Sequence, residues 1–158
     1  PRVLAAQSDR ADPFFRAFQN GFAHKQTVVA GETQATAIRI GDPVSFSRAV
    51  RAMRACEGVV ESICERDLAD VARTADFCGL YVCPQTAIAL AATKRAIASG
   101  LISKKQTIVV VSTAHGLKFQ EFKQRSVADD IPDASIGLAL APRQVPDSFT
   151  AVEEAALS

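Results

Sequence analysis

The sequence predicts an α/β fold, in which a parallel sheet is covered by helices on both faces. Short apolar runs of strand length alternate along the chain with longer stretches whose apolar residues recur at helical spacing. The run from Thr107 to Val111 is apolar from Ile108 onward, which is typical of a strand buried on both faces of a parallel sheet. Consecutive strands of such a sheet are joined by right-handed crossovers.

Length and charge limit the function classes. The chain has 158 residues, which suits one domain with a real core. Its 18 basic and 17 acidic residues are interspersed and leave a net charge of +1, so the sequence lacks the basic patch typical of nucleic-acid binding. No apolar run reaches the ~18 residues that a membrane span needs. We therefore expect neither nucleic acid nor a membrane as a partner.

The first elements are a strand and a short helix. The run Val3–Gln7 predicts the strand, and Asp12 followed by Pro13 predicts a helix with Asp12 as its N-cap, ending near Gly21. A polar connector follows to about residue 36, and its apolar pairs at 28–29 and 37–38 predict short edge strands.

Two amphipathic helices and a strand come next. Residues 45–56 carry apolar side chains at positions 46, 49, 50 and 53, which is helical spacing. Residues 58–63 predict a short strand. The helical spacing returns between Glu65 and Cys78, and Gly79 is placed to end that helix.

The remaining strands lie at residues 80–83 and 107–111, and the Ala-rich run 85–99 between them predicts a helix that begins after Pro84 and ends at Gly100. Beyond Lys118 the sequence becomes polar, and Pro132, Pro142 and Pro146 favour a loosely packed tail. We therefore divide the chain into an α/β part, residues 1–119, and a tail, residues 120–158.

Small polar residues follow the strand 107–111 directly. Open α/β sheets bind ligands beyond the carboxyl ends of their strands, so Ser112, Thr113, His115 and Gly116 occupy the expected position of a binding site. His115 has the pKa range of a general base, but the interpretation that we favour is a histidine that contacts the backbone in a turn. The four cysteines match no zinc or redox spacing, so we expect reduced and mostly buried thiols and no metal site.

Three segments resemble, in order and in spacing, the carboxyl-terminal half of the threonine synthase family: residues 35–43, 79–86 and 110–118. The resemblance extends from about Pro1 to Phe119, and its most specific part is the last segment. This family belongs to the fold-type II, tryptophan-synthase-β-like group of pyridoxal-phosphate enzymes. The resemblance therefore implies that residues 1–119 are the carboxyl-terminal part of the large domain of such an enzyme.

The resemblance also implies a reaction and a set of site residues. Threonine synthases convert O-phosphohomoserine and water to threonine and phosphate, using pyridoxal 5'-phosphate held as a Schiff base to a lysine. That lysine lies in the first half of the family's sequence and matches nothing here, so we expect no catalytic residue in this chain and no activity from it alone. Thr113 corresponds to the residue that hydrogen-bonds the cofactor's ring nitrogen, Ala35 to a residue packed against the ring, and Thr86 to a hydroxyl near the same ring edge.

The resemblance also implies a branch of the family, the partners of the protein and its cellular location. Cys83, before Pro84, is similar to the plant-like branch of the family, and the location implied is the plastid for a plant protein and the cytoplasm otherwise. The implied partner is the small substrate O-phosphohomoserine, with a homodimer as an option for the full-length parent. Lys25 and Lys118 lie in no context that predicts the buried, reactive amine of a substitute Schiff-base lysine.

Three other functions remain open at this point. In the first, the parent enzyme is another fold-type II lyase, such as a serine or threonine dehydratase or a cysteine-synthase-like protein. In the second, the chain is a non-catalytic fragment that binds an intact synthase. A nucleotide-binding or regulatory α/β module is disfavoured, because the sequence has neither a Gly-x-Gly-x-x-Gly fingerprint nor a Gly-Lys-Ser/Thr phosphate loop.

Overall fold

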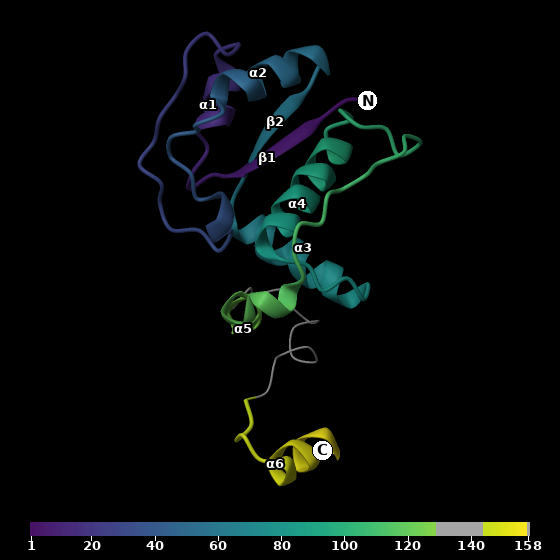
Figure 1. Ribbon diagram of the computed structural model, residues 1–158. Helices are drawn as coiled ribbons and strands as arrows, with labels where there is room; N and C mark the ends of the chain where they lie inside the picture. The colour runs from purple at the N-terminus through teal and green to yellow at the C-terminus, as the bar shows by residue number, and fades with distance from the viewer. Residues whose placement is uncertain (129–143, 158) are drawn as a thin grey trace.

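A computed structural model describes residues 1–128 and 144–157, and it contains a small parallel sheet between two layers of helices (Figure 1). Strands β1 (Leu4–Ser8) and β2 (Val59–Ile63) pair in parallel, in a register that sets Leu4 opposite Val59 and Ser8 opposite Ile63. The α/β class with helices on both faces of a parallel sheet is confirmed.

Side chains alternate between the two faces of this sheet, as the pleat requires. On one face Ala5 and Val60 pack with α1 (Pro13–Gln19) and α2 (Phe46–Ala55), in a cluster that includes Phe14, Val50 and Met53. On the other face Leu4, Ala6 and Ile63 pack with α3 (Glu65–Phe77) and α4 (Pro84–Ala98). The second cluster is the larger core, and it positions the candidate site.

The residues predicted to start and end α1 and α3 lie at those helix ends, but one of them does not make the capping bond expected of it. Gly79 has a φ of 78° beyond the end of α3, a left-handed conformation that glycine adopts at low cost. Asp12 does occupy the N-cap position of α1, but its side chain makes no capping bond. Its carboxylate instead accepts hydrogen bonds from Arg16 Nε at 2.8 Å and from Ser62 Oγ at 3.0 Å, which ties α1 to β2.

The edge strands predicted at 28–29 and 37–38 are wrong. Val28 donates one backbone bond to the carbonyl of Gly41, and residues 36–38 form a single turn of 3-10 helix, η1 (Thr36–Ile38). Two adjacent apolar residues are too short a pattern to show a period, so they do not distinguish a strand from a loop that buries one side chain.

The strands predicted at 80–83 and 107–111 are also wrong as ladder strands. Residues 80–83 form only an isolated antiparallel bridge, between Val82 and His115. Residues 107–111 pair with no strand in the described part of the chain, and they are not interior: Val109 is 84% exposed and Val111 is 73% exposed. The apolar sequence of a central strand is present, but the described residues supply no neighbouring strands to bury it.

The end of the chain is more structured than predicted. After η2 (Gly116–Lys118) come α5 (Gln120–Ala128) and, past the segment that is not described, α6 (Phe149–Leu157). Phe122 of α5 is 4% exposed and belongs to the larger core, while the division at residue 119 stays a prediction. Pro132 and Pro142 lie outside the described residues. No helix in the described ranges is long and apolar enough to cross a membrane.

Candidate cofactor site

The candidate site lies where the segment after residue 111 meets the start of α4. The bridge between Val82 and His115 holds the two chain segments together, and the N–H of Gly116 donates to the carbonyl of Tyr81 at 2.8 Å. His115 is the N-cap of η2 (Gly116–Lys118), and its Nδ1 accepts from the N–H of Leu117 at 3.2 Å. The interpretation of His115 as a turn residue that contacts the backbone is confirmed.

Thr86 and Thr113 are in direct contact at this point. The N–H of Thr113 donates to Thr86 Oγ1 at 3.3 Å, and the Thr86 hydroxyl donates to Ser112 Oγ at 3.5 Å. Thr86 is 2% exposed, whereas Thr113 is exposed to solvent. Thr113 is therefore joined to α4 through its backbone N–H, while the residue itself is exposed.

Cys83 is the centre of this cluster, a role that the sequence analysis did not assign to it. Its Sγ lies 3.1 Å from Thr86 Oγ1 and 3.5 Å from Thr113 Oγ1, and it caps α4 by accepting the N–H of Thr86 at 3.4 Å. Burial raises the pKa of the thiol, but hydrogen bonds from the hydroxyls of Thr86 and Thr113 and from backbone N–H groups outweigh burial and lower that pKa. The signal available in the sequence was its position before Pro84, at a helix start.

Gly116 allows the two segments to approach. A Cβ atom at this position would lie 2.7 Å from Tyr81 Cδ1 and 2.9 Å from the carbonyl oxygen of Val82. Any larger residue would push the segment that carries Thr113 away from α4.

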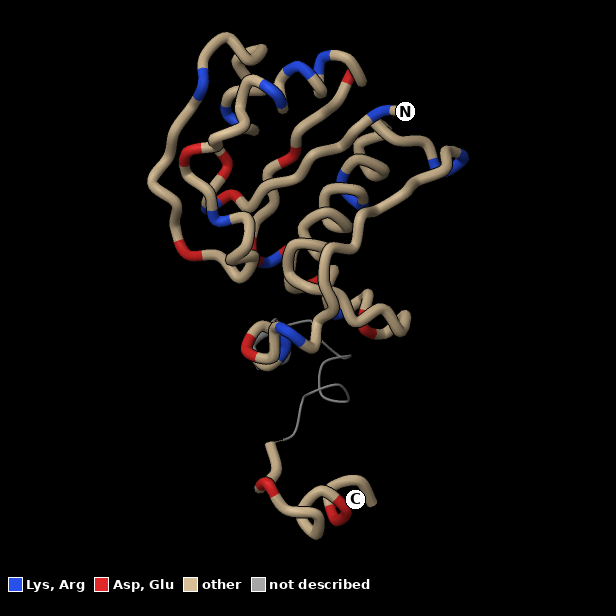
Figure 2. The backbone as a smooth tube through the Cα atoms, in the orientation of Figure 1, with Lys and Arg blue, Asp and Glu red and all other residues tan. Residues whose placement is uncertain are grey.

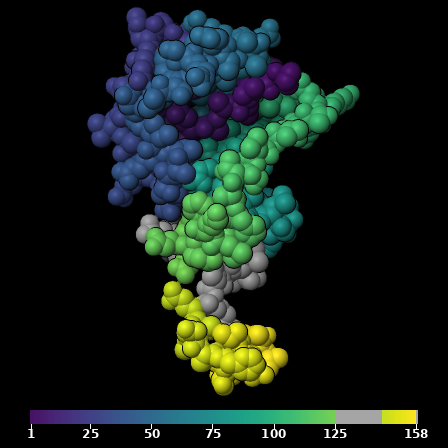
Figure 3. Space-filling view, viewed as in Figure 1, coloured from purple at the N-terminus to yellow at the C-terminus, as the bar shows by residue number. Residues whose placement is uncertain are grey.

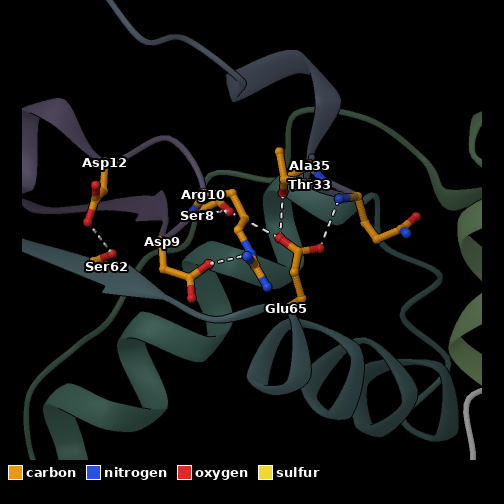
Figure 4. Close-up of polar contacts among 9 residues, drawn as sticks. Ser8, Asp9, Arg10, Asp12, Thr33, Ala35, Ser62 and Glu65 are labelled. Atoms are coloured by element: carbon orange, nitrogen blue, oxygen red, sulfur yellow. Dashed lines mark hydrogen bonds and ion pairs between the residues drawn. The ribbon is translucent and has the colours of Figure 1, made fainter. Parts of the chain in front are cut away.

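Ala35 reaches the same core from the connector between α1 and α2. It is fully buried in the cluster that contains Val82, Ala87 and Ile88. The carboxylate of Glu65, at the first position of α3, holds its loop (Figure 4): it accepts from Thr33 Oγ1 at 2.6 Å, from the N–H of Gln34 at 2.9 Å and from Ser8 Oγ at 3.1 Å. Sequence reasoning misses this anchor, because its partners lie on two segments that are far from Glu65 along the chain.

The structure thus brings Thr86, Thr113 and Ser112 together, and it packs Ala35 into the core that supports them. Among the described residues, Thr113 makes polar contacts with the Thr86 hydroxyl and the Cys83 thiol and with no carboxylate. A neutral donor and acceptor of this kind suits an unprotonated ring nitrogen, whereas a carboxylate would favour the protonated ring. The residues present therefore fit the ring-nitrogen end of a pyridine cofactor.

Three lysines were considered as substitutes for the missing Schiff-base lysine: Lys25, Lys118 and Lys123. Lys25 is paired with Asp42, and Lys118 is exposed. Lys123 is buried, but its Nζ contacts both oxygens of Asp76, at 2.6 and 2.8 Å, and lies 4.2 Å from the centre of the Tyr81 ring. None of these amines is placed as a free nucleophile beside Thr113.

Charge and metal-binding groups are spread over the surface. Acidic and basic residues are interspersed over the chain, with a run of basic residues on α2 (Figure 2). In the described ranges, no group of His, Cys, Asp and Glu side chains has the geometry to hold a metal ion. All four cysteines are free thiols, as expected, but Cys83 alone is buried and Cys78 is exposed, so the expectation of mostly buried thiols is wrong.

The family follows from comparison with known proteins. Residues 1–114 match the family described as pyridoxal-phosphate dependent enzyme. The chain belongs to this family. It is 39% identical over 153 residues to "threonine synthase 2, chloroplastic" of Arabidopsis thaliana, a match that covers 96% of this chain and 30% of that protein. It is 32% identical over 119 residues to threonine synthase of Methanocaldococcus jannaschii, covering 75% of this chain and 29% of that protein.

A solved structure supports the fold assignment. The crystal structure of threonine synthase from Escherichia coli matches with a TM-score of 0.61 at 19% identity, and the match covers 99% of this chain and 37% of that one. This member of the pyridoxal-phosphate family therefore spans about a third of the length of the relatives that it matches.

Proposed function

We propose that this chain forms the ring-nitrogen side of the cofactor site in a threonine synthase, which converts O-phosphohomoserine and water to threonine and phosphate. The observation that carries the proposal is the contact between Thr86 and Thr113, two residues from separate motifs that meet in a cluster without a carboxylate. The names of the relatives supply the reaction.

Each of the three site residues has a distinct part in this proposal. Thr113 presents its open hydroxyl to the ring nitrogen of pyridoxal 5'-phosphate, and Thr86 orients Thr113 through its backbone N–H. Ala35 keeps the space beside the ring free of a larger side chain. When bound, the cofactor supplies the electron-withdrawing ring that weakens bonds at the amino acid's α-carbon. A neutral hydroxyl leaves that ring a weaker electron acceptor, so other groups direct the outcome.

The lysine that holds the cofactor, and the groups that bind its phosphate, belong in this proposal to polypeptide outside the present sequence. The isolated chain then neither binds the cofactor covalently nor releases phosphate. A plastid location for a plant parent follows only from the name of the Arabidopsis relative.

A chimeric enzyme tests the proposal. In it, this chain replaces the 153-residue region of the Arabidopsis threonine synthase that it matches. We expect the chimera to show the visible absorbance of bound pyridoxal phosphate and to release phosphate from O-phosphohomoserine. A preference for serine, threonine or O-acetylserine would reassign the chain to the dehydratases or to the cysteine-synthase-like enzymes.

The role of Thr113 is tested in the same chimera. Replacing Thr113 with Val removes one hydrogen bond to the ring, so kcat/KM should fall by about 5–10-fold, which corresponds to about 1–1.4 kcal/mol. Thr74→Val is the matched control, because the exposed Thr74 hydroxyl donates to the carbonyl of Asp70 within α3. Equal activity of the two variants would remove Thr113 from the site.

A further inference from the structure

Lys123 is a buried cation that has no part in the proposed function as described so far. It lies on α5, and its side chain is 3% exposed. Its Nζ donates to both carboxylate oxygens of Asp76 on α3, at 2.6 and 2.8 Å, and lies 4.2 Å from the centre of the Tyr81 ring. A buried ammonium is costly unless its charge is compensated, and here a carboxylate and the face of an aromatic ring do so. The amine is therefore held in one position.

Stability alone does not account for this buried ion pair. Replacing such a pair with well-packed apolar residues of similar volume is often neutral or stabilising. An apolar contact between α5 and α3 would therefore join the two helices about as well. An apolar contact lacks direction, whereas an ammonium donates to oxygens at defined positions and lies over a ring face. The charged pair thus fixes where the Lys123 side chain lies.

The alkyl stem of Lys123 lies against the segment that carries Thr113. A Cβ atom at Gly116 would lie 2.8 Å from Lys123 Cε and 2.7 Å from Tyr81 Cδ1, so the lysine stem and the tyrosine ring fill the space beside this glycine. The N–H of Gly116 donates to the carbonyl of Tyr81 at 2.8 Å, and the rings of Tyr81 and His115 lie 5.7 Å apart. Lys123 and Tyr81 therefore pack against the chain three positions after Thr113.

The backbone before Thr113 supplies no anchor of its own. Residues 107–111 make no backbone-to-backbone hydrogen bond with any part of the chain that the structure describes, and Val111 is 73% exposed. In the space-filling view, the green part of the chain, which contains these residues, runs over the visible surface before it reaches α5 (Figure 3). The position of Thr113 therefore depends on the contacts of residues 112–116, with the start of α4 on the one hand and with Tyr81 and Lys123 on the other.

We propose that Lys123 is a positioning residue for the cofactor site: it holds Gly116 against Tyr81, and so keeps the Thr113 hydroxyl where the ring nitrogen of pyridoxal phosphate is bound. Asp76 fixes the ammonium, so α5 and α3 together set the geometry of a site that neither helix lines. The inference rests on the proposed function, because Thr113 meets the ring only in that function. Lys123 itself needs no contact with the cofactor.

Amide exchange measured by NMR in the chain itself tests the positioning without any cofactor. The double variant Lys123→Met with Asp76→Leu removes both charges and keeps side chains of similar volume, so the fold should persist. We expect the amides of Gly116 and Thr113 to exchange at least ~5-fold faster than in the unaltered chain, because their hydrogen bonds open more often. A purely stabilising ion pair would leave these two amides unchanged once stability is recovered.

A control and a second variant make this measurement decisive. Arg73→Met with Asp70→Leu is the matched control, because it removes an ion pair that lies within α3, and it should leave the Gly116 and Thr113 amides unchanged. The second variant, Tyr81→Leu, removes the ring over which the ammonium lies and should give the same faster exchange. Unchanged exchange of the two amides in whichever of the two test variants folds would overturn the proposal.

The chimera with the Arabidopsis synthase gives a kinetic test. The Lys123→Met, Asp76→Leu chimera should lose kcat by no more than the ~5–10-fold expected for Thr113→Val, with little change in KM, because the weakened bond is to the cofactor ring and not to the substrate. In a chimera that already carries Thr113→Val, the same double variant should cause no further loss, because both changes act through one hydroxyl. Effects that multiply in full would show that Lys123 acts by another route, and would overturn the proposal.

The inference and the proposed function fail on different results. Faster exchange of the Thr113 amide in the chain, with a chimera that releases no phosphate, would reject the proposed function and leave Lys123 as the residue that positions Thr113. A chimera that releases phosphate and is impaired by Thr113→Val, but keeps full kcat in the Lys123→Met, Asp76→Leu variant, would do the reverse.

Discussion

The backbone N–H of Thr113 donates a hydrogen bond to Oγ1 of Thr86 at 3.3 Å, and this bond joins two motifs separated by 27 positions in the sequence. Thr86 is buried in the first turn of α4, and Thr113 lies on an exposed segment. The position of the exposed hydroxyl is therefore set by a rigid helix start, which is the arrangement that a precise binding site requires.

The thiol of Cys83 offers a direct measure of this cluster. Its pKa lies below the ordinary value of 9.0, because hydroxyl and backbone donors stabilise the thiolate more than burial disfavours it. Thr86→Val removes one hydroxyl donor and should raise this pKa, as measured by thiolate absorbance in a chain whose other three cysteines are replaced by serine. Thr93→Val is the control and should leave the titration unchanged.

The lowered pKa also fixes the sign of a pH effect on stability. Between the pKa of Cys83 in the folded chain and the higher value in the unfolded chain, the unfolded state binds more protons, so the free energy of unfolding rises with pH. This contribution is fully present above the unfolded pKa and is lost as the pH falls through the folded pKa. Urea unfolding at a series of pH values should show the rise, and Cys83→Ala should remove it.

Glu65 is expected to be the principal polar support of the loop that carries Ala35. Glu65→Ala leaves the Thr33 hydroxyl and the Gln34 N–H without their acceptor, and should lower the free energy of unfolding by about 1.5–3 kcal/mol, the range for hydrogen bonds to a charged group. Chemical denaturation measures the loss. Glu32→Ala, in an exposed part of the same loop, should change stability by less than about 0.5 kcal/mol.

Sequence patterns located the helices and the paired strands because periodicity is local. The spacing of Phe46, Val50 and Met53 predicts the face of α2 that packs against Phe14 and Val60, and the structure confirms it. The apolar composition of residues 107–111 predicts an interior strand, but burial depends on neighbouring strands that the described chain does not provide. Composition shows what a segment is suited to, and tertiary partners decide whether it is buried.

The candidate site was predictable only in part. Thr86, Thr113 and Ala35 came from motif resemblance, and the structure brings the first two into contact. Cys83 and Glu65 were missed in these roles because their partners lie on other segments, which no spacing rule connects. Long-range hydrogen bonds of this kind emerge from packing, and a single sequence does not encode them as a pattern.

Gly116 is expected to tolerate no side chain. A Cβ would lie 2.7 Å from Tyr81 and 2.8 Å from Lys123 Cε, so Gly116→Ala should cost about 1–3 kcal/mol of unfolding free energy, as overpacking does elsewhere. Gly31→Ala is the matched control, because its Cβ would meet Arg10 only at ordinary contact distances of 3.5 Å or more. Equal melting temperatures for the two variants would contradict the close approach.

The ion pair between Lys123 and Asp76 is expected to hold α5 against α3. Lys123 is 3% exposed and Asp76 is 12% exposed, so Lys123→Met leaves a largely buried carboxylate without its cation. Breaking such a pair costs about 3–5 kcal/mol, whereas replacing both partners with apolar residues is often neutral. Urea unfolding should therefore show a large loss of unfolding free energy for Lys123→Met. The double variant with Lys123→Met and Asp76→Leu should recover that stability. Lys94→Met, on the exposed face of α4, is the control and should show little change.

The single tyrosine of the chain gives this interaction a second readout. Burial raises the pKa of Tyr81, and the negative charge of Asp76 raises it further. Asp76→Leu removes the smaller of these two causes, so the pKa of Tyr81 should move down only part of the way toward its ordinary value of 10.0. Phenolate absorbance measures the shift without interference from other tyrosines. A titration that is unchanged in a folded Asp76→Leu variant would show that the carboxylate does not act on Tyr81.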